Sequence, residues 1–214
     1  MFYGLLAIGK RMVQFLYVPL KLLPTQRKVT LMSRRQRSDS IDFTLLKREI
    51  AAQYPDVKVV SLNHRMSSKA LHVFHILQEM YHLATSKAVI VDSYVIPVSI
   101  LEHKKSLEVI QIWHALGAIK QFGHMSIGKK EGNTRRLSTL MNMHHNYTYV
   151  TTGSRKMIDV FVQAFDQDRH AVKPIGMPRV DYLLDASTTD ADAESIHDSY
   201  PELVDKKVVL YAPT

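Results

Sequence analysis

The sequence has no cysteine in its 214 residues and no acidic residue among its first 37. Without cysteine, the chain has no disulfide, no thiolate metal ligand and no cysteine nucleophile, which is compatible with a reducing compartment. Hydrophobic residues make up 46% of the chain and charged residues 22%. This composition can bury a core, so a disordered chain and a low-complexity fibre are excluded. The length allows one large domain, or one domain and part of a second.

The excess of positive charge lies entirely at the N-terminus. The formal net charge is +8. The cations of the first 37 residues are Lys10, Arg11, Lys21, Arg27, Lys28, Arg34, Arg35 and Arg37. The other 20 basic residues balance the 20 acidic ones, so residues 38–214 are neutral. A basic segment beside a neutral domain indicates an anionic partner, and membrane lipid and nucleic acid are the two candidates.

Long hydrophobic runs are also missing. After Lys10 and Arg11, the longest uncharged run is 12–20, which has nine residues, whereas a membrane-spanning helix needs roughly 20. A signal peptide would carry its charges first and then an apolar run with a small-residue cleavage site. Here the charges interrupt the apolar segment, so neither kind of segment is predicted.

Residues 2–23 fit an amphipathic helix better. One helical stripe is polar apart from its valine, and it consists of Lys10, Gln14, Val18 and Lys21. Such a helix lies in the membrane interface, apolar side down, with its cations at anionic headgroups. We therefore expect residues 1–28 to form a membrane-interface segment, kinked at Pro19 and ended by Pro24. The residues expected to contact the membrane are Lys10, Arg11, Phe15, Leu16 and Lys21.

Two other interpretations of this segment stay open. It could be a terminal helix packed on the protein's own core, although eight unopposed cations favour the interface. It could also bind nucleic acid. That is disfavoured because no recognisable reading module accompanies the segment and the domain behind it is neutral.

Short β-rich runs alternate with helical stretches from residue 29 onward. Strands are predicted at 29–33, 57–62, 87–92, 107–113, 147–152 and 172–175. Helices are predicted at 41–50 and 69–85, and another begins near Arg155. This alternation is typical of a parallel sheet covered on both faces. We expect 29–180 to form a Rossmann-like α/β domain.

The composition changes again toward the C-terminus. From Asp181 to Asp205 there are eight acidic residues and no Lys or Arg, which predicts a helical connector with a solvated acidic face over 181–205. The run KKVVLYAPT (206–214) then begins a new strand without a following crossover or partner. We expect it to be the first strand of a C-terminal domain that this chain lacks.

Familiar phosphate and metal motifs are absent from the sequence. There is no GxxxxGK[ST] loop and no GxGxxG after a strand. The eleven histidines do not have the spacing of metal ligands; His144 and His145 are adjacent and so point to different sides. The sequence therefore predicts no metal site.

The strongest candidate site follows the strand predicted at 107–113. That strand ends at the only tryptophan, Trp113, and His114, Gly117 and Lys120 come next. Ligands of open α/β sheets bind beyond the carboxyl ends of the strands. His114 can accept a proton there near neutral pH, and Lys120 can meet a phosphate. The alternatives are a structural histidine at a turn and a solvated surface lysine.

Three further residues are weaker candidates. Asp92 ends a predicted strand, where a site residue would lie. Ser154 precedes a helix whose N-terminus could bind phosphate, although a plain helix cap explains it equally well. Arg179 follows the strand predicted at 172–175 and could contact phosphate or pair with Asp181.

A family resemblance now becomes specific. WHALGAIKQFG (113–123) resembles the W-H-[G/A]-x-G-x-x-K-x-F-G signature of the CDP-glycerol glycerophosphotransferase family, the enzymes of teichoic-acid synthesis. Further segments agree in order: KAVIVDSYVIP (87–97), YVTTGSRKMIDVFVQAF (149–165), GMPRVDYLL (176–184) and KKVVLYAPT (206–214). The resemblance covers nearly all of 29–214.

The resemblance implies a two-domain GT-B-like transferase. Its N-terminal domain accepts a lipid-linked primer or growing polymer, and its C-terminal domain binds CDP-glycerol or CDP-ribitol. His114 takes the role of catalytic base: an acceptor hydroxyl attacks the β-phosphate, and CMP leaves. A second functional histidine belongs to the C-terminal domain, so this chain alone is expected to be incomplete.

These inferences lead to one expectation and one alternative. We expect the acceptor-side part of a peripheral transferase at the cytoplasmic face of the plasma membrane. Its donor substrate is CDP-glycerol, it has no covalently bound cofactor, and its partners are an anionic membrane surface and a lipid-linked teichoic acid acceptor. The alternative is a membrane-docked binding module without catalysis. The sequence leaves open glycerol or ribitol, primase or polymerase, fragment or natural truncation, and the oligomeric state.

Overall fold

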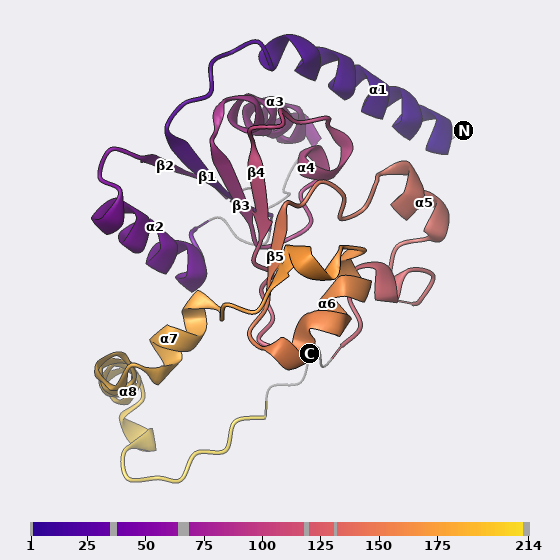
Figure 1. Cartoon of the computed structure of the whole chain (residues 1–214). Helices are drawn as coiled ribbons and strands as arrows, with labels where there is room; N and C mark the ends of the chain where they lie inside the picture. The colour runs from indigo at the N-terminus through magenta and orange to yellow at the C-terminus, as the bar shows by residue number, and fades with distance from the viewer. Residues whose placement is uncertain (1, 35–37, 64–68, 118–119, 131, 212–214) are drawn as a thin grey trace. The chain divides into compact units, whose positions relative to one another are not determined.

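A computed structural model of the chain describes the backbone of residues 2–34, 38–63, 69–117, 120–130 and 132–211 (Figure 1). The chain divides into two compact units, Met1–Met177 and Pro178–Thr214. The division falls within a few residues of the domain boundary expected after 180. The first unit contains the sheet and the second is helical.

The described part of the first unit is built on a six-stranded sheet in the order β2-β1-β3-β4-β5-β6. Every pairing is parallel, which confirms the predicted parallel sheet. The strands are β1 (Lys28–Ser33), β2 (Lys58–Asn63), β3 (Ala88–Val91), β4 (Glu108–Gln111), β5 (Tyr149–Thr151) and β6 (Val172–Lys173). Because all strands run the same way, their carboxyl ends and the loops that follow share one edge.

Helices connect the strands. They are α1 (Phe2–Leu20), α2 (Ile41–Gln53), α3 (Lys69–Thr85), α4 (Ile96–Ile100), α5 (Arg135–Leu140) and α6 (Ile158–Phe165). Short 3₁₀ turns lie at η1 (Gly123–Ser126), η2 (Arg155–Met157) and η3 (Arg169–Ala171). The sequence did not predict α4 or α5, since each is too short to show a helical period. Pro97 fits in the first turn of α4 because the first turn needs no backbone donor.

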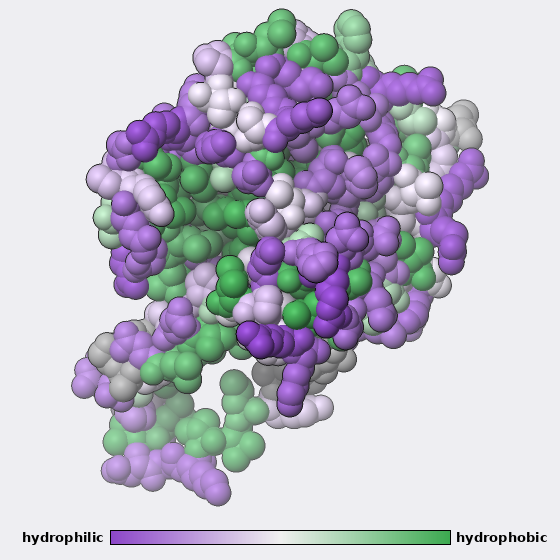
Figure 2. All heavy atoms as spheres, in the orientation of Figure 1, coloured by the Kyte–Doolittle hydropathy of each residue, from purple (hydrophilic) through white to green (hydrophobic). Residues whose placement is uncertain are grey.

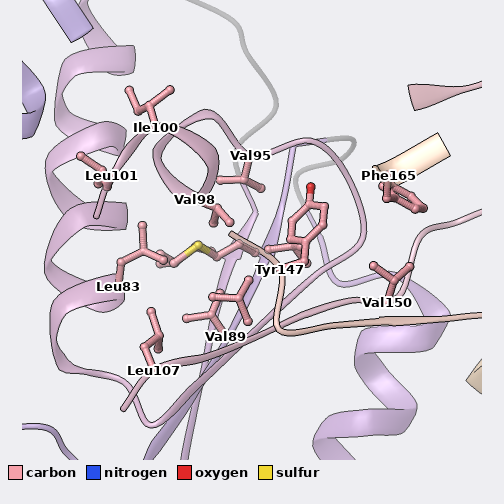
Figure 3. Close-up of a cluster of buried hydrophobic side chains, with 14 of the residues drawn as sticks. Leu83, Val89, Val95, Val98, Ile100, Leu101, Leu107, Tyr147, Val150 and Phe165 are labelled. Carbon is pink, nitrogen blue, oxygen red and sulfur yellow. The ribbon is translucent and has the colours of Figure 1, made fainter. Parts of the chain in front are cut away.

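Alternate side chains of the strands belong to two hydrophobic cores, one on each face of the sheet. Val89 and Val91 of β3 join the larger core with residues of α1, α3, α4 and α6 (Figure 3). Ile90, between them, points to the other face of the sheet. There it packs with Leu31 of β1 and with Phe43 of α2. Hydrophobic residues gather beside α2 on the face of the molecule seen in Figure 2. Ser40 caps α2 by accepting from Phe43 N at 3.3 Å.

The polar stripe of α1 faces the protein, which corrects the orientation expected from the sequence. Lys10 Nζ donates to Leu140 O at 2.8 Å and to Asn142 Oδ1 at 3.0 Å. Gln14 Nε2 donates to Ile100 O at 2.7 Å, and Tyr17 is buried beside His103. Lys10 therefore lies against the protein and not at a headgroup layer, and its burial lowers its pKa.

Seven large apolar side chains of α1 are exposed; six lie away from the polar stripe, and Val18 is the exposed member of that stripe. The seven are Phe2, Leu5, Ile8, Met12, Phe15, Leu16 and Val18, and Phe15 is 77% exposed. The helix ends at Leu20, directly after Pro19, and not at Pro24 as expected. No described helix is both long and apolar enough to cross a membrane. We call these seven residues the α1 apolar face.

The second unit contains α7 (Pro178–Leu184), α8 (Ala186–Ser199) and the 3₁₀ turn η4 (Pro201–Leu203). The connector is helical, as its sequence predicts, and Tyr182 of α7 donates to Asp192 of α8 at 2.8 Å. A new strand was expected over 206–214. Its described part, 206–211, forms no strand, and 212–214 lie outside the described residues. A strand needs a neighbouring edge to bond with, and the described part of this unit is otherwise helical.

Gly123 and Gly117 offer a matched test of how the segment 113–123 packs on α6. Gly123 has φ +56°, and a Cβ there would lie 2.1 Å from Ala164 O in α6, whereas a Cβ at Gly117 would meet nothing within 4 Å. We expect Gly123→Ala to lower the free energy of unfolding by about 2 kcal/mol or more, and Gly117→Ala to change it by less than about 0.5 kcal/mol. Urea unfolding followed by circular dichroism measures both; equal losses would contradict this packing of Gly123 on α6.

Candidate active site

His114 lies where β4 ends, beside the end of β3. Its Nδ1 is 2.9 Å from Asp92 O, the first carbonyl after β3. A carbonyl oxygen only accepts, so Nδ1 carries the proton in this contact. In the neutral ring, Nε2 then holds the lone pair. The fold therefore presents His114, which is half-buried, in the tautomer that a general base acting through Nε2 requires.

The residue before His114 has an unusual backbone. Trp113 has φ 54°, a left-handed conformation that bulky residues rarely adopt. Gln111 stabilises it from the end of β4: Oε1 accepts from Trp113 N at 2.8 Å. Gln111 Nε2 donates to Ser93 O at 3.1 Å and to Tyr147 Oη at 3.1 Å. The fully buried Gln111 side chain thus joins the loops after β3 and β4 at the turn that aims His114.

Aromatic packing explains the spacing of the motif. The Trp113 ring stacks on Phe122, with centroids 4.8 Å apart and an interplanar angle of 20°. It also meets Phe165 of α6 edge-on at 5.3 Å and lies 4.2 Å from the ring of His114. Phe122 and Gly123 therefore bring the chain back onto α6 after the loop. The first and last parts of the motif form one packed unit.

His144 and Tyr147 are site neighbours that the sequence did not single out. His144 is 3% exposed, and its Nδ1 is 3.0 Å from Tyr147 Oη. Burial lowers the pKa of His144 to about 3, so its ring is neutral at physiological pH. His144 therefore serves as an uncharged packing and hydrogen-bonding group. The sequence offered one signal for this network: Gln111, an amide side chain at the end of a strand predicted to be buried.

Asp92 is buried at the end of β3, next to the end of β1. Ser33 Oγ donates to Asp92 Oδ2 at 3.0 Å, which links the two strand ends. The sheet order reverses direction between β1 and β3, and ligands of doubly wound sheets bind at this reversal. Asp92 thus holds the site edge together through both its carbonyl and its carboxylate.

The loops after β4 and β5 lie side by side. A Cβ at Gly153 would lie 3.8 Å from Leu116 O, so the Gly153–Ser154 turn borders the loop that carries Gly117. Ser154 is exposed and occupies the N-cap position of η2, but its side chain makes no cap hydrogen bond. Lys120 is exposed as well.

The structure thus gathers His114, Asp92, Gly117 and Ser154 at one edge of the sheet. Arg179 belongs to the first turn of α7 in the second unit, and it is described apart from them. Among the described residues, no three His, Asp or Glu side chains are grouped as metal ligands would be.

Gln111→Leu tests the network beneath His114. Leucine keeps the volume but leaves Trp113 N, Ser93 O and Tyr147 Oη without this partner. We expect a loss of about 2–4 kcal/mol in the free energy of unfolding, since buried unsatisfied groups cost about 1–3 kcal/mol each. The fluorescence and near-UV circular dichroism of the single tryptophan should also change. Unaltered Trp113 spectra would contradict a role for Gln111 in holding this turn.

Two curated relatives match most of this chain. The teichoic acid ribitol-phosphate primase of Bacillus spizizenii (strain ATCC 23059 / NRRL B-14472 / W23) is 31% identical over 198 residues, 90% of this chain and 51% of the relative. The teichoic acid glycerol-phosphate primase of Bacillus subtilis (strain 168) is 28% identical over 176 residues, 82% of this chain and 43% of the relative. The chain thus spans about half the length of these curated relatives.

A solved structure and a family model agree with these relatives. The wall teichoic acid polymerase TagF, from a crystal soaked with CDPG, superposes with a TM-score of 0.72 at 16% identity. The match covers 99% of this chain and 55% of that chain, so the fold corresponds to about half of a GT-B-like enzyme. The family model of CDP-glycerol:poly(glycerophosphate) glycerophosphotransferases matches residues 15–214. The chain therefore belongs to this family of teichoic acid polyol-phosphate transferases.

Proposed function

We propose that this chain is the acceptor-side part of a transferase that moves glycerol phosphate, or ribitol phosphate, from its CDP-alditol to a lipid-linked teichoic acid. The observation that carries the proposal is the placement of His114. Its Nδ1 proton is engaged by Asp92 O, and the ring sits at the strand ends where ligands of such sheets bind. Family membership supplies the substrate class.

His114 acts as the general base in this reaction. A hydroxyl oxygen of the acceptor attacks the β-phosphorus of the CDP-alditol while its proton passes to His114 Nε2. The bond from the β-phosphorus to the bridging oxygen breaks, and CMP leaves with that oxygen. Positioning and charge stabilisation supply most of the rate in such transfers, and a general base contributes about 10²–10⁴-fold.

The neighbouring loops are suited to hold acceptor phosphate. Gly117 is open, since a Cβ added there would have nothing within 4 Å, and Ser154 is exposed beside this loop. We assign Lys120 to neutralising acceptor phosphate from the same loop. Arg179, in the first turn of α7, remains a phosphate-binding candidate.

His114→Ala should lower CMP release from CDP-glycerol at least about 100-fold, because the hydroxyl loses its base. The assay uses the chain with any continuation that its gene encodes, a lipid-linked acceptor, and CDP-ribitol in parallel. The matched control is His145→Ala, since His145 is exposed and outside the hydrogen bonds of the site. Near-normal turnover in a folded His114→Ala protein would refute the assignment.

The α1 apolar face supports peripheral placement at the inner surface of the plasma membrane. Seven large apolar side chains exposed on one helix would be costly to leave in water. Arg11 is exposed beside them, whereas Lys10, Arg27, Lys28 and Arg34 bond within the protein. An anionic bilayer interface matches both properties, at about 1 kcal/mol per cation near the surface.

Phe15→Asp should weaken binding to vesicles that contain anionic phospholipid at least about tenfold. The change puts a negative charge in the centre of the α1 apolar face. The matched control is Ile175→Asp, which alters a side chain of similar exposure, 75%, outside α1. Vesicle sedimentation measures both proteins. Equal binding would refute the docking surface, and preference for DNA over vesicles would favour the nucleic-acid interpretation.

A binding module without catalysis is the second candidate. In that case the chain would bind acceptor polymer, and the protein would release no CMP from either donor under the assay above.

A further inference from the structure

A cavity of about 360 Å³ lies between α1 and α5. Its wall comes from three parts of the chain that are distant in sequence. Phe2 and Leu6 belong to α1, Tyr94 and Ile96 follow β3, and Leu137 and Met141 lie in and after α5. At roughly 30 Å³ for each water-sized group, the cavity has room for about a dozen such groups. This size suits a ligand or one segment of a ligand.

The side chains that line the cavity favour a hydrocarbon ligand. The two hydroxyl groups that line it are engaged within the protein. Tyr94 Oη donates to Met141 O at 3.1 Å, and Ser138 Oγ donates to Met143 Sδ at 3.7 Å. The remaining wall is mostly aliphatic, aromatic and thioether surface. Asn133 also lines the cavity, and its Nδ2 donates to Met143 Sδ at 3.5 Å. An apolar occupant would therefore bury mostly apolar surface.

Two cations precede Leu137 and Ser138 of the cavity wall in the sequence, and Arg136 lines a neighbouring pocket with Tyr3. Arg135 and Arg136 begin α5 and are exposed, and the Arg136 guanidinium lies 4.3 Å from the ring centroid of Tyr3 in α1. The segment 120–148 has five Lys or Arg residues and one acidic residue. The occupant should therefore join its hydrocarbon to an anionic group such as phosphate.

The cavity lies between the two surfaces already assigned. Phe2 lines it and also belongs to the α1 apolar face. On the other side, the Tyr94 ring is 5.2 Å from that of His144, which is 6.1 Å from Trp113. Tyr94 also follows Asp92, the partner of His114, by two residues. A lipid in this cavity would thus bridge the membrane-facing helix and the site loops.

We propose that this cavity holds the hydrocarbon segment next to the phosphate of the lipid-linked acceptor, with Arg135 and Arg136 at its phosphate. The inference rests on the proposed function, because that function supplies an acceptor carried on a lipid phosphate. It adds a binding site for the lipid end of that acceptor, separate from His114. A bulk phospholipid is the competing occupant, and the experiment distinguishes the two.

The test measures calorimetric binding of farnesyl phosphate, a prenyl phosphate, below its micelle concentration. Farnesol, inorganic phosphate and lysophosphatidylglycerol are titrated separately. We expect farnesyl phosphate to bind at least tenfold more tightly than the other three. No binding of farnesyl phosphate, or equal affinity for lysophosphatidylglycerol, would overturn the proposal.

Variants place the ligand in the cavity. Leu137→Trp fills the cavity with apolar bulk and Leu137→Gln makes its wall polar, and each should weaken binding of farnesyl phosphate at least tenfold. Two separate changes keep the test valid if one variant fails to fold. Arg136→Gln should weaken the binding of farnesyl phosphate but not the binding of farnesol. Ile175→Asp, outside the cavity wall, should keep full affinity; unaltered binding in both Leu137 variants would overturn the site.

The CMP-release assay separates this inference from the proposed function. CMP release to a water-soluble glycerol-phosphate acceptor, together with no farnesyl phosphate binding, would overturn the cavity site alone. Farnesyl phosphate binding that is weakened by the Leu137 variants, without any CMP release, would support the cavity site and refute the transferase.

Discussion

The amide side chain of Gln111 is the contact on which the candidate site depends. It accepts from Trp113 N and donates to Ser93 O, so one buried group joins the loops that follow β3 and β4. The left-handed turn at Trp113 is stable only because this acceptor and the stacked Phe122 ring hold it. His114 follows directly, and its orientation comes from that turn.

Helix α1 shows that amphipathicity does not determine which side of a helix faces the protein. Its polar stripe packs inward because backbone carbonyls at Leu140 and Ile100 need donors, and Lys10 and Gln14 supply them. Such charge-assisted and amide hydrogen bonds anchor the helix. The apolar side is consequently left for another surface. The proposed membrane surface, the proposed hydrocarbon-binding cavity and the site loops then follow one another across a short part of the first unit.

In the proposed reaction, this chain would supply the base and the acceptor side. The first unit places His114 at the strand ends, beside the reversal of the sheet order. The second unit begins at Pro178, carries Arg179 in α7, and continues into the acidic helix α8. A GT-B-like enzyme needs both an acceptor side and a donor side to bring an acceptor hydroxyl to a nucleotide-linked phosphate.

The sequence by itself determined the strand order along the chain, the parallel sheet, the helical connector and the position of His114 after a strand. These features depend on local patterns of apolar residues and on the edge that parallel strands share. Tertiary structure alone decided the inward side of α1, the absence of a strand over 206–211 and the Gln111 network. Each of these depends on partners far away in sequence: the carbonyls that Lys10 and Gln14 meet, a neighbouring sheet edge, and the hydroxyl of Tyr147.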